Sequence, residues 1–181
     1  MNNLAWARWW SAPWMSCHND WAAVDRYVEL RKRIRSHQEC AANIYGIVPC
    51  LPPNPQPTLL KLALASTDQL ELALALIDST CRHTQTSVLD ESQNQWCTRL
   101  SKTLPLDILQ PDDDPLQLLR TWVPSETWQR IRLRFPRSRI LELEKQTFLL
   151  DDSLSRLDTL WQAVVWRIAP SIAPDSKEPG D

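Results

Sequence analysis

Histidine and cysteine are the side chains of this sequence best suited to chemistry, because both bind metal ions and both serve in nucleophilic catalysis. His37 stands three residues before Cys40, so a helix would place the two on one face, and His18 directly follows Cys17. These four residues could form a zinc site only if separate helices converged, and no paired spacing supports this. Structural roles are the better interpretation of these residues and of His83. We expect no metal and no other cofactor.

Acidic residues give no clearer active site. Residues 112–114 are three aspartates, which could bind a hard cation but lack further oxygen ligands at loop spacing. The start of a helix explains them equally well, with Asp114 as its capping residue. Glu142 and Glu144 are two residues apart, so they point to different faces of a helix. We therefore predict no catalytic residues and interpret the protein as a non-enzyme.

Arginines form the strongest charge feature, with five of them between positions 130 and 139. One interpretation is a solvent-exposed helix face paired with Glu142, Glu144 or residues 112–114. The other is a docking patch for an acidic protein partner, for which the candidate contacts are Arg132, Arg137 and Arg139.

Nucleic acid is a poor candidate partner. The formal net charge is −2, whereas domains that bind a phosphate backbone are usually strongly basic. Only Trp128 and Phe135 accompany the arginine cluster, which is too few aromatic residues for a base-stacking surface. We predict protein partners and no nucleic acid.

Four of the ten tryptophans fall within the first fourteen residues, at Trp6, Trp9, Trp10 and Trp14. Tryptophan is enriched among the interface residues that dominate binding energy, so these residues are candidate protein contacts. The alternative is that they cover the hydrophobic end of a small helical bundle. Both interpretations place the rings against protein.

Cysteine usage and hydropathy indicate a reducing, cytoplasmic location. The five cysteines are an odd number without a CxxC pair, which is typical of reduced thiols rather than of a disulfide framework. The most apolar stretch, 72–77, is six residues long and is flanked by Glu71 and Asp78. We therefore expect neither a secretory leader nor insertion into a membrane.

Glycine and proline usage predicts an all-α protein. Only Gly46 and Gly180 are present, which excludes glycine-rich phosphate loops and nucleophile elbows. Fourteen prolines stand between the helical patterns instead, and five of them in 49–57 predict an extended connector. We expect a compact multi-helix domain over 19–169, preceded by a tryptophan-rich arm over 1–18 and followed by a disordered tail over 170–181.

Helical periodicity and capping residues predict the elements of this domain. A helix should begin at Asn19 or Asp20 and end near Gly46. Ser66 and Gln69 form a capping box, which predicts two helices or one kinked helix in the leucine-rich segment 58–83, with Leu64 among the core residues. A further helix is expected over 87–100. Another should start at 114–115, where Gln117 completes a capping box with Asp114. Two more are expected, one from 124–125 onward and one with an apolar seam from 154 to 168.

The segment 128–135 fits two structures. Trp128, Ile131 and Phe135 follow helical spacing, whereas Ile131, Leu133 and Phe135 alternate with arginines as in a strand. Helix is favoured, because a lone strand in a glycine-poor chain has no partner.

Three segments resemble the K-type adaptor of bacterial type III secretion systems. The first is "PWMSCHNDW", with Pro13, Trp14, His18 and Trp21; the second is the leucine-rich "LPPNPQPTLLKLALASTDQLELALALIDSTCRH"; the third is "WQRIRLRFP" at 128–136. The resemblance implies a non-enzymatic adaptor of the cytosolic sorting platform. Its partners would be the cytoplasmic domain of the inner-membrane ring and the pod protein. The alternative is a cytosolic chaperone or regulator that binds an exported substrate.

Overall fold

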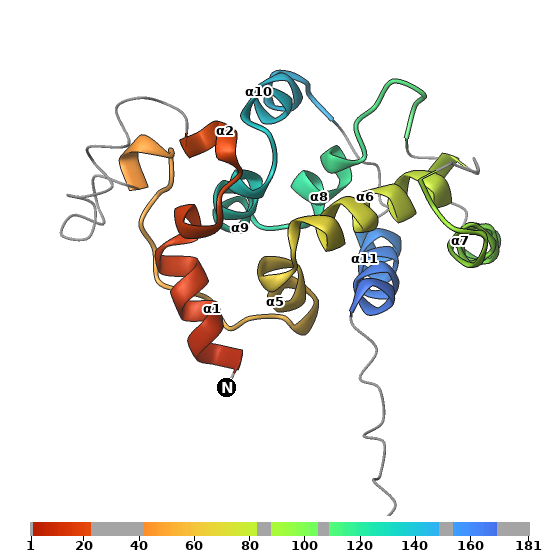
Figure 1. Cartoon of the computed structure of the whole chain (residues 1–181), viewed down its shortest axis with the longest axis horizontal. Coiled ribbons are helices and arrows are strands. Elements are labelled where there is room, and N and C mark those ends of the chain that lie inside the picture. Colours follow the sequence, from red (N-terminus) through yellow and green to blue (C-terminus); the bar gives the residue numbers. More distant parts are fainter. Residues whose placement is uncertain (1, 23–41, 83–87, 105–108, 149–153, 170–181) are drawn as a thin grey trace, which may run out of the picture.

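The computed structural model describes residues 2–22, 42–82, 88–104, 109–148 and 154–169, and every regular element in these ranges is a helix (Figure 1). The predicted all-α fold is confirmed, as a single compact domain. The elements are α1 (Asn2–Ser11), η1 (Pro13–Ser16), α2 (Asn19–Ala22), α5 (Pro57–Leu64), α6 (Thr67–Arg82), α7 (Glu91–Thr103), α8 (Leu116–Trp122), α9 (Ser125–Ile131), η2 (Arg132–Arg134), α10 (Arg137–Lys145) and α11 (Leu154–Ile168).

Helices α5 and α6 form the centre of the fold, and the predicted capping box separates them. The Ser66 N–H donates to Gln69 Oε1 at 2.8 Å, and the Gln69 N–H donates to Ser66 Oγ at 3.2 Å. These two bonds satisfy backbone donors that the start of a helix leaves free. The other expected core residues are buried: Leu59, Leu62, Leu70, Leu74 and Ile77. Leu64 is not a core residue, because it lies on the outer side of the last turn of α5 and is 46% exposed.

Helix α11 packs against α5, α6 and α8, so its apolar seam docks within this domain. Leu157, Trp161 and Val164 are fully buried on the inner face. The Trp161 ring stacks on Trp122 of α8 with 5.5 Å between the ring centroids. Burial of one helix face against neighbours, rather than a free-standing coiled coil, stabilises this seam.

Two helix starts differ in detail from the sequence predictions. Helix α7 begins at Glu91 rather than near 87, because Asp90 forms a capping box with Gln93. Asp114 does accept a backbone hydrogen bond from Leu116 before α8, as expected of a cap. Gln117 does not complete a box there. It is fully buried, and its Nε2 donates to the Leu143 carbonyl oxygen at 3.0 Å.

The predicted proline-rich connector is confirmed as a non-helical segment that runs from the turn at Gly46 to the start of α5. Gly46 has φ +63°, a left-handed conformation that favours glycine, and it ends a helical turn at 42–44 as expected. The rest of that predicted helix, at 23–41, lies outside the described residues. The same is true of His37, Cys40, His83, the predicted cap of α11 and the tail 170–181.

Segment 125–134 is helical, which confirms the favoured alternative. Helix α9 continues directly into the single turn η2, and the chain becomes extended at Phe135. In the described ranges, no helix combines the length and the apolar character that crossing a bilayer would require.

Candidate functional site

The N-terminal tryptophans are core residues. Helix α1 places Trp6, Trp9 and Trp10 on one face, and these three side chains and Trp14 are each at most 8% exposed. The Trp6 ring centroid lies 5.2 Å from both the Trp9 and the Trp10 ring centroids. Helix α1 packs on α5, so the segment predicted as an arm is part of the domain's packing.

Two of these indoles attach the proline-rich connector to α1. Trp6 Nε1 donates to the Pro53 carbonyl oxygen at 2.9 Å, and Trp10 Nε1 donates to the Cys50 carbonyl oxygen at 3.0 Å. Trp9 Nε1 is buried without an acceptor among the described residues. The connector therefore lies along α1 because buried indole N–H groups need acceptors, and its carbonyls provide them.

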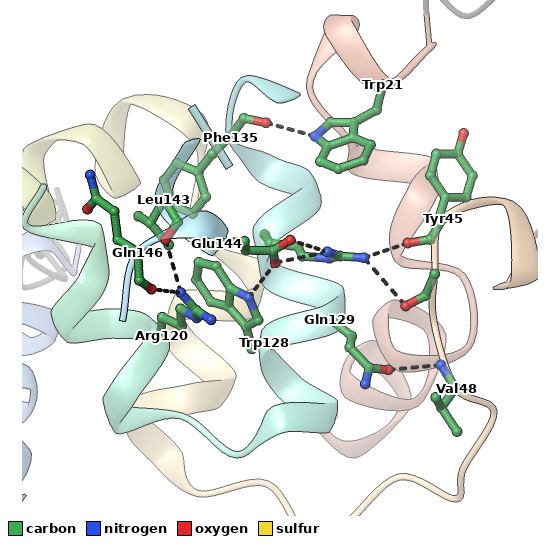
Figure 2. Close-up of polar contacts among 12 residues, drawn as sticks. Trp21, Tyr45, Val48, Arg120, Trp128, Gln129, Phe135, Leu143, Glu144 and Gln146 are labelled. Atoms are coloured by element: carbon green, nitrogen blue, oxygen red, sulfur yellow. Dashed lines mark hydrogen bonds and ion pairs between the residues drawn. The ribbon is translucent and has the colours of Figure 1, made fainter. Parts of the chain in front are cut away.

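The segment after α1 contacts the chain near residue 133, more than a hundred positions away. The His18 N–H donates to the Leu133 carbonyl oxygen at 2.7 Å. Trp21 Nε1 donates to the Phe135 carbonyl oxygen at 2.8 Å (Figure 2). Trp14 stacks on Tyr45, with interplanar angle 3° and centroids 6.0 Å apart. We call the residues 13–21 together with 128–136 the aromatic joint.

Arg132 of the aromatic joint is held by hydrogen bonds to Glu144 and Tyr45, both of which Figure 2 labels. Its Nη1 donates to both carboxylate oxygens of Glu144, at 2.9 and 3.0 Å, and its Nη2 donates to the Tyr45 carbonyl oxygen at 2.8 Å. Trp128 Nε1 donates to the same Glu144 carboxylate at 2.9 Å. Arg132, one of the three candidate docking residues, is therefore engaged within the fold.

Arg139 is paired inside the molecule as well. Its Nε and Nη2 donate to Asp114 at 2.7 and 2.8 Å, and Glu71 lies 3.7 Å from Nη1. Burial alone would raise the pKa of Asp114, but the hydrogen bonds from Arg139 and from the Leu116 N–H outweigh it and lower that pKa below its ordinary value. The Asp114 carboxylate therefore links the start of α8 to α10, and its hydrogen bonds to Arg139 and Leu116 explain it without a cation site.

Arg137 is the third candidate docking residue, and it lies on the surface. Its guanidinium carbon is 5.7 Å from the centroid of the Trp21 ring, within cation–π range, and the side chain is exposed. Among the described residues it makes no ion pair within 4 Å. The structure thus separates Arg137, which a partner can reach, from Arg132 and Arg139.

Arg130 and Arg134 are buried arginines whose roles the sequence analysis did not predict. Arg134 donates to the carbonyl oxygens of Ala63 and Ala65 at the end of α5. Arg130 donates to the Trp10 carbonyl oxygen at the end of α1. Both helix ends carry partial negative charge on free carbonyls, which these guanidinium groups satisfy. The available signal was spacing: Arg130 and Arg134 are four residues apart, so a helix places them on the same face.

A third arginine donates to free carbonyls at the end of α10. Arg120 Nη1 donates to the Leu143 and Gln146 carbonyl oxygens at 3.0 and 3.3 Å (Figure 2). We call Arg120, Arg130 and Arg134 the capping arginines. They connect α8 and α9–η2 to the ends of three other helices, so they fix how these elements sit relative to one another.

Thiols and metal ligands give no second site. Burial and the nearby charge of Asp78 raise the pKa of the Cys81 thiol to about 12, so this cysteine stays protonated and unreactive. Cys50, Cys81 and Cys97 form no disulfide among the described residues. In the ranges that the structure covers, no three His, Cys, Asp or Glu side chains gather as a metal site would require.

A few large apolar side chains remain exposed. Trp166 on the outer face of α11 is 78% exposed, and Met15 in η1 is also 78% exposed. In the connector, Leu51 is 90% exposed. These side chains and Arg137 are surface features that a protein partner can contact.

No protein-family model, curated protein or solved structure matches this chain.

Proposed function

We propose that this protein is a non-enzymatic, cytoplasmic adaptor of a type III secretion sorting platform. It bridges the cytoplasmic domain of the inner-membrane ring to the pod protein. The observation that carries the proposal is the aromatic joint: two of the three segments that resemble the K-type adaptor family, 13–21 and 128–136, contact each other directly in the fold.

The contacts in the aromatic joint involve the residues on which the resemblance rests. His18 and Trp21 of the first segment donate to backbone carbonyls at Leu133 and Phe135 in the third. Trp128 and Arg132 of the third segment share the Glu144 carboxylate. Residues that resemble a family pattern and form one packed unit support a shared architecture more strongly than separate likenesses would.

A rigid joint suits an adaptor, because a surface that is already ordered loses little conformational entropy on binding. The connector, α1 and α9–η2 are fixed to one another by buried indole and guanidinium hydrogen bonds. The exposed side chains beside them, Arg137 and Met15, are therefore presented in a defined geometry.

Affinity purification of the tagged full chain from its native host tests the proposal. We expect the ring component and the pod protein to copurify with it, as identified by mass spectrometry. Recovery of a single exported substrate without either platform component would instead identify a chaperone.

A pair of charge reversals maps the contact. Arg137→Glu changes an exposed arginine next to the aromatic joint, where it lies against Trp21, and Lys102→Glu changes an exposed residue of α7 as a matched control. Because neither residue is buried, both variants should fold normally. If an acidic partner binds at the joint, Arg137→Glu reduces its recovery and Lys102→Glu does not. Equal recovery with both variants would place the contact elsewhere.

A further inference from the structure

A cavity of about 320 Å³ lies between α1 and the proline-rich connector. The buried residues Trp10, Trp14 and Ile47 form its inner wall, and the exposed Pro49 and Pro52 stand at its mouth. A largely apolar hollow of this volume is at the lower end of the range of small-molecule sites. The cavity therefore has the size and lining to enclose one aromatic ring or a short aliphatic chain.

One charged group lines this cavity, the guanidinium of Arg130, whose side chain is only 3% exposed. It lies 4.0 Å from the centroid of the Trp10 ring. Three of its five N–H groups donate to backbone carbonyl oxygens, those of Trp10 at 3.0 Å, Glu126 at 2.8 Å and Val48 at 3.3 Å. The side chain of Cys50 is a further hydrogen-bond partner of the guanidinium, and sulfur is only a weak acceptor.

The charge of Arg130 has no carboxylate partner among the described residues, since none lies within 4 Å. Its hydrogen-bond partners are three carbonyl dipoles, which carry only partial charge, and the Cys50 side chain. Burial accordingly lowers the pKa of Arg130 below its ordinary value, although an arginine remains protonated. A buried cation in a cavity wall with no carboxylate within 4 Å favours an anionic ligand.

We propose that this cavity binds a small carboxylate carried on an apolar body. The guanidinium N–H groups match the oxygens of a carboxylate, which can displace the weaker Cys50 contact, and the Trp10 and Trp14 rings and prolines match an aromatic or aliphatic remainder. A phosphate fits less well, because a second negative charge would need a second cation, and Arg130 is the only cation among the described residues that line the cavity.

The probes are 4-fluorophenylacetate and its neutral amide, 4-fluorophenylacetamide, titrated into the full chain and followed by fluorine NMR. The acid should bind in the millimolar range or tighter, and at least about tenfold tighter than the amide, because only the acid neutralises Arg130. Bound acid should also slow alkylation of Cys50, an exposed lining residue, as measured by peptide mapping.

Two alanines of α1 provide a matched pair of variants. Ala7 lines the cavity and Ala5 does not, and both are half-buried residues of the same helix. Ala7→Leu fills the cavity and should abolish binding of the acid, whereas Ala5→Leu should retain it. The proposal is overturned if acid and amide bind equally, if the acid does not bind, or if Ala7→Leu binds it as well as the wild type. A folded Arg130→Gln variant should lose the preference for the acid.

Discussion

Trp6 and Trp9 differ in one respect that can be measured. Both rings are buried and stacked on each other, but Trp6 Nε1 donates to Pro53, whereas Trp9 Nε1 has no acceptor among the described residues. Replacing either tryptophan by phenylalanine removes the indole N–H, and the loss of side-chain volume is similar at the two positions. Trp6→Phe should therefore lower the free energy of unfolding by about 1 kcal/mol more than Trp9→Phe, the usual net contribution of one hydrogen bond. Urea denaturation compares them, and equal losses would contradict the assignment of the Trp6 bond.

Asp114 makes the stability of the protein depend on pH in the acid range. Because its pKa is lower in the folded state than the ordinary value of 3.8, the charged form stabilises the fold above that value. The contribution disappears as the pH falls from 3.8 through the lower pKa of the folded state. The free energy of unfolding of Asp114→Asn should therefore fall less steeply with acid than that of the wild type.

Denaturation at a series of acid pH values measures this difference. Asp112→Asn is the matched control, because Asp112 is an exposed neighbour in the same run. It should follow the wild-type profile. Identical profiles for Asp114→Asn and the wild type would show that the Arg139 pair does not contribute to folding.

At the scale of elements, arginines hold helix ends in place. Arg134 is buried and donates to two carbonyls at the end of α5, whereas Arg137, three residues later, is exposed. Arg134→Met leaves those carbonyls without donors and should cost about 2 kcal/mol of unfolding free energy. Arg137→Met should stay within about 0.5 kcal/mol of the wild type. Chemical denaturation of both variants checks this, and a neutral Arg134→Met would contradict the capping role.

Local signals predicted the elements well. The Ser66–Gln69 capping box, the left-handed Gly46 and the seam of α11 each depend on residues within a few positions of one another, and each is present in the structure. Helix α1 was not predicted as a helix, although Trp6, Trp9 and Trp10 have helical spacing. Tryptophan is common both in interfaces and in cores, so the residue type alone did not identify a helix face.

Long-range pairs could not be predicted in the same way. Arg132 meets the Tyr45 carbonyl across 87 positions, and Trp21 meets the Phe135 carbonyl across 114. A backbone carbonyl carries no residue-specific signal, so nothing in the sequence identified these acceptors. The same limit applied to Gln117. Its position three residues after Asp114 fitted a capping box, but its side chain donates to the Leu143 carbonyl oxygen instead.

At the scale of the whole molecule, the aromatic joint and Arg130 tie α1, η1 and α2 to α9 and η2 (Figure 1). Arg134 ties η2 to the end of α5, and Arg120 ties α8 to the end of α10. Residues that the sequence offered as a docking patch are used for this internal connection, with Arg137 left on the surface. An adaptor built this way presents its contacts on one stable body rather than on a flexible arm.

The most direct test of the adaptor proposal is whether the chain binds two platform components at once. The purified full chain is mixed with the cytoplasmic ring domain and the pod protein of its host, separately and together, and the masses of the complexes are measured by size-exclusion chromatography with light scattering. A bridging adaptor predicts both binary complexes and a ternary complex whose mass includes all three proteins. Competition between the ring domain and the pod protein for the chain, or binding of neither, would contradict the proposal.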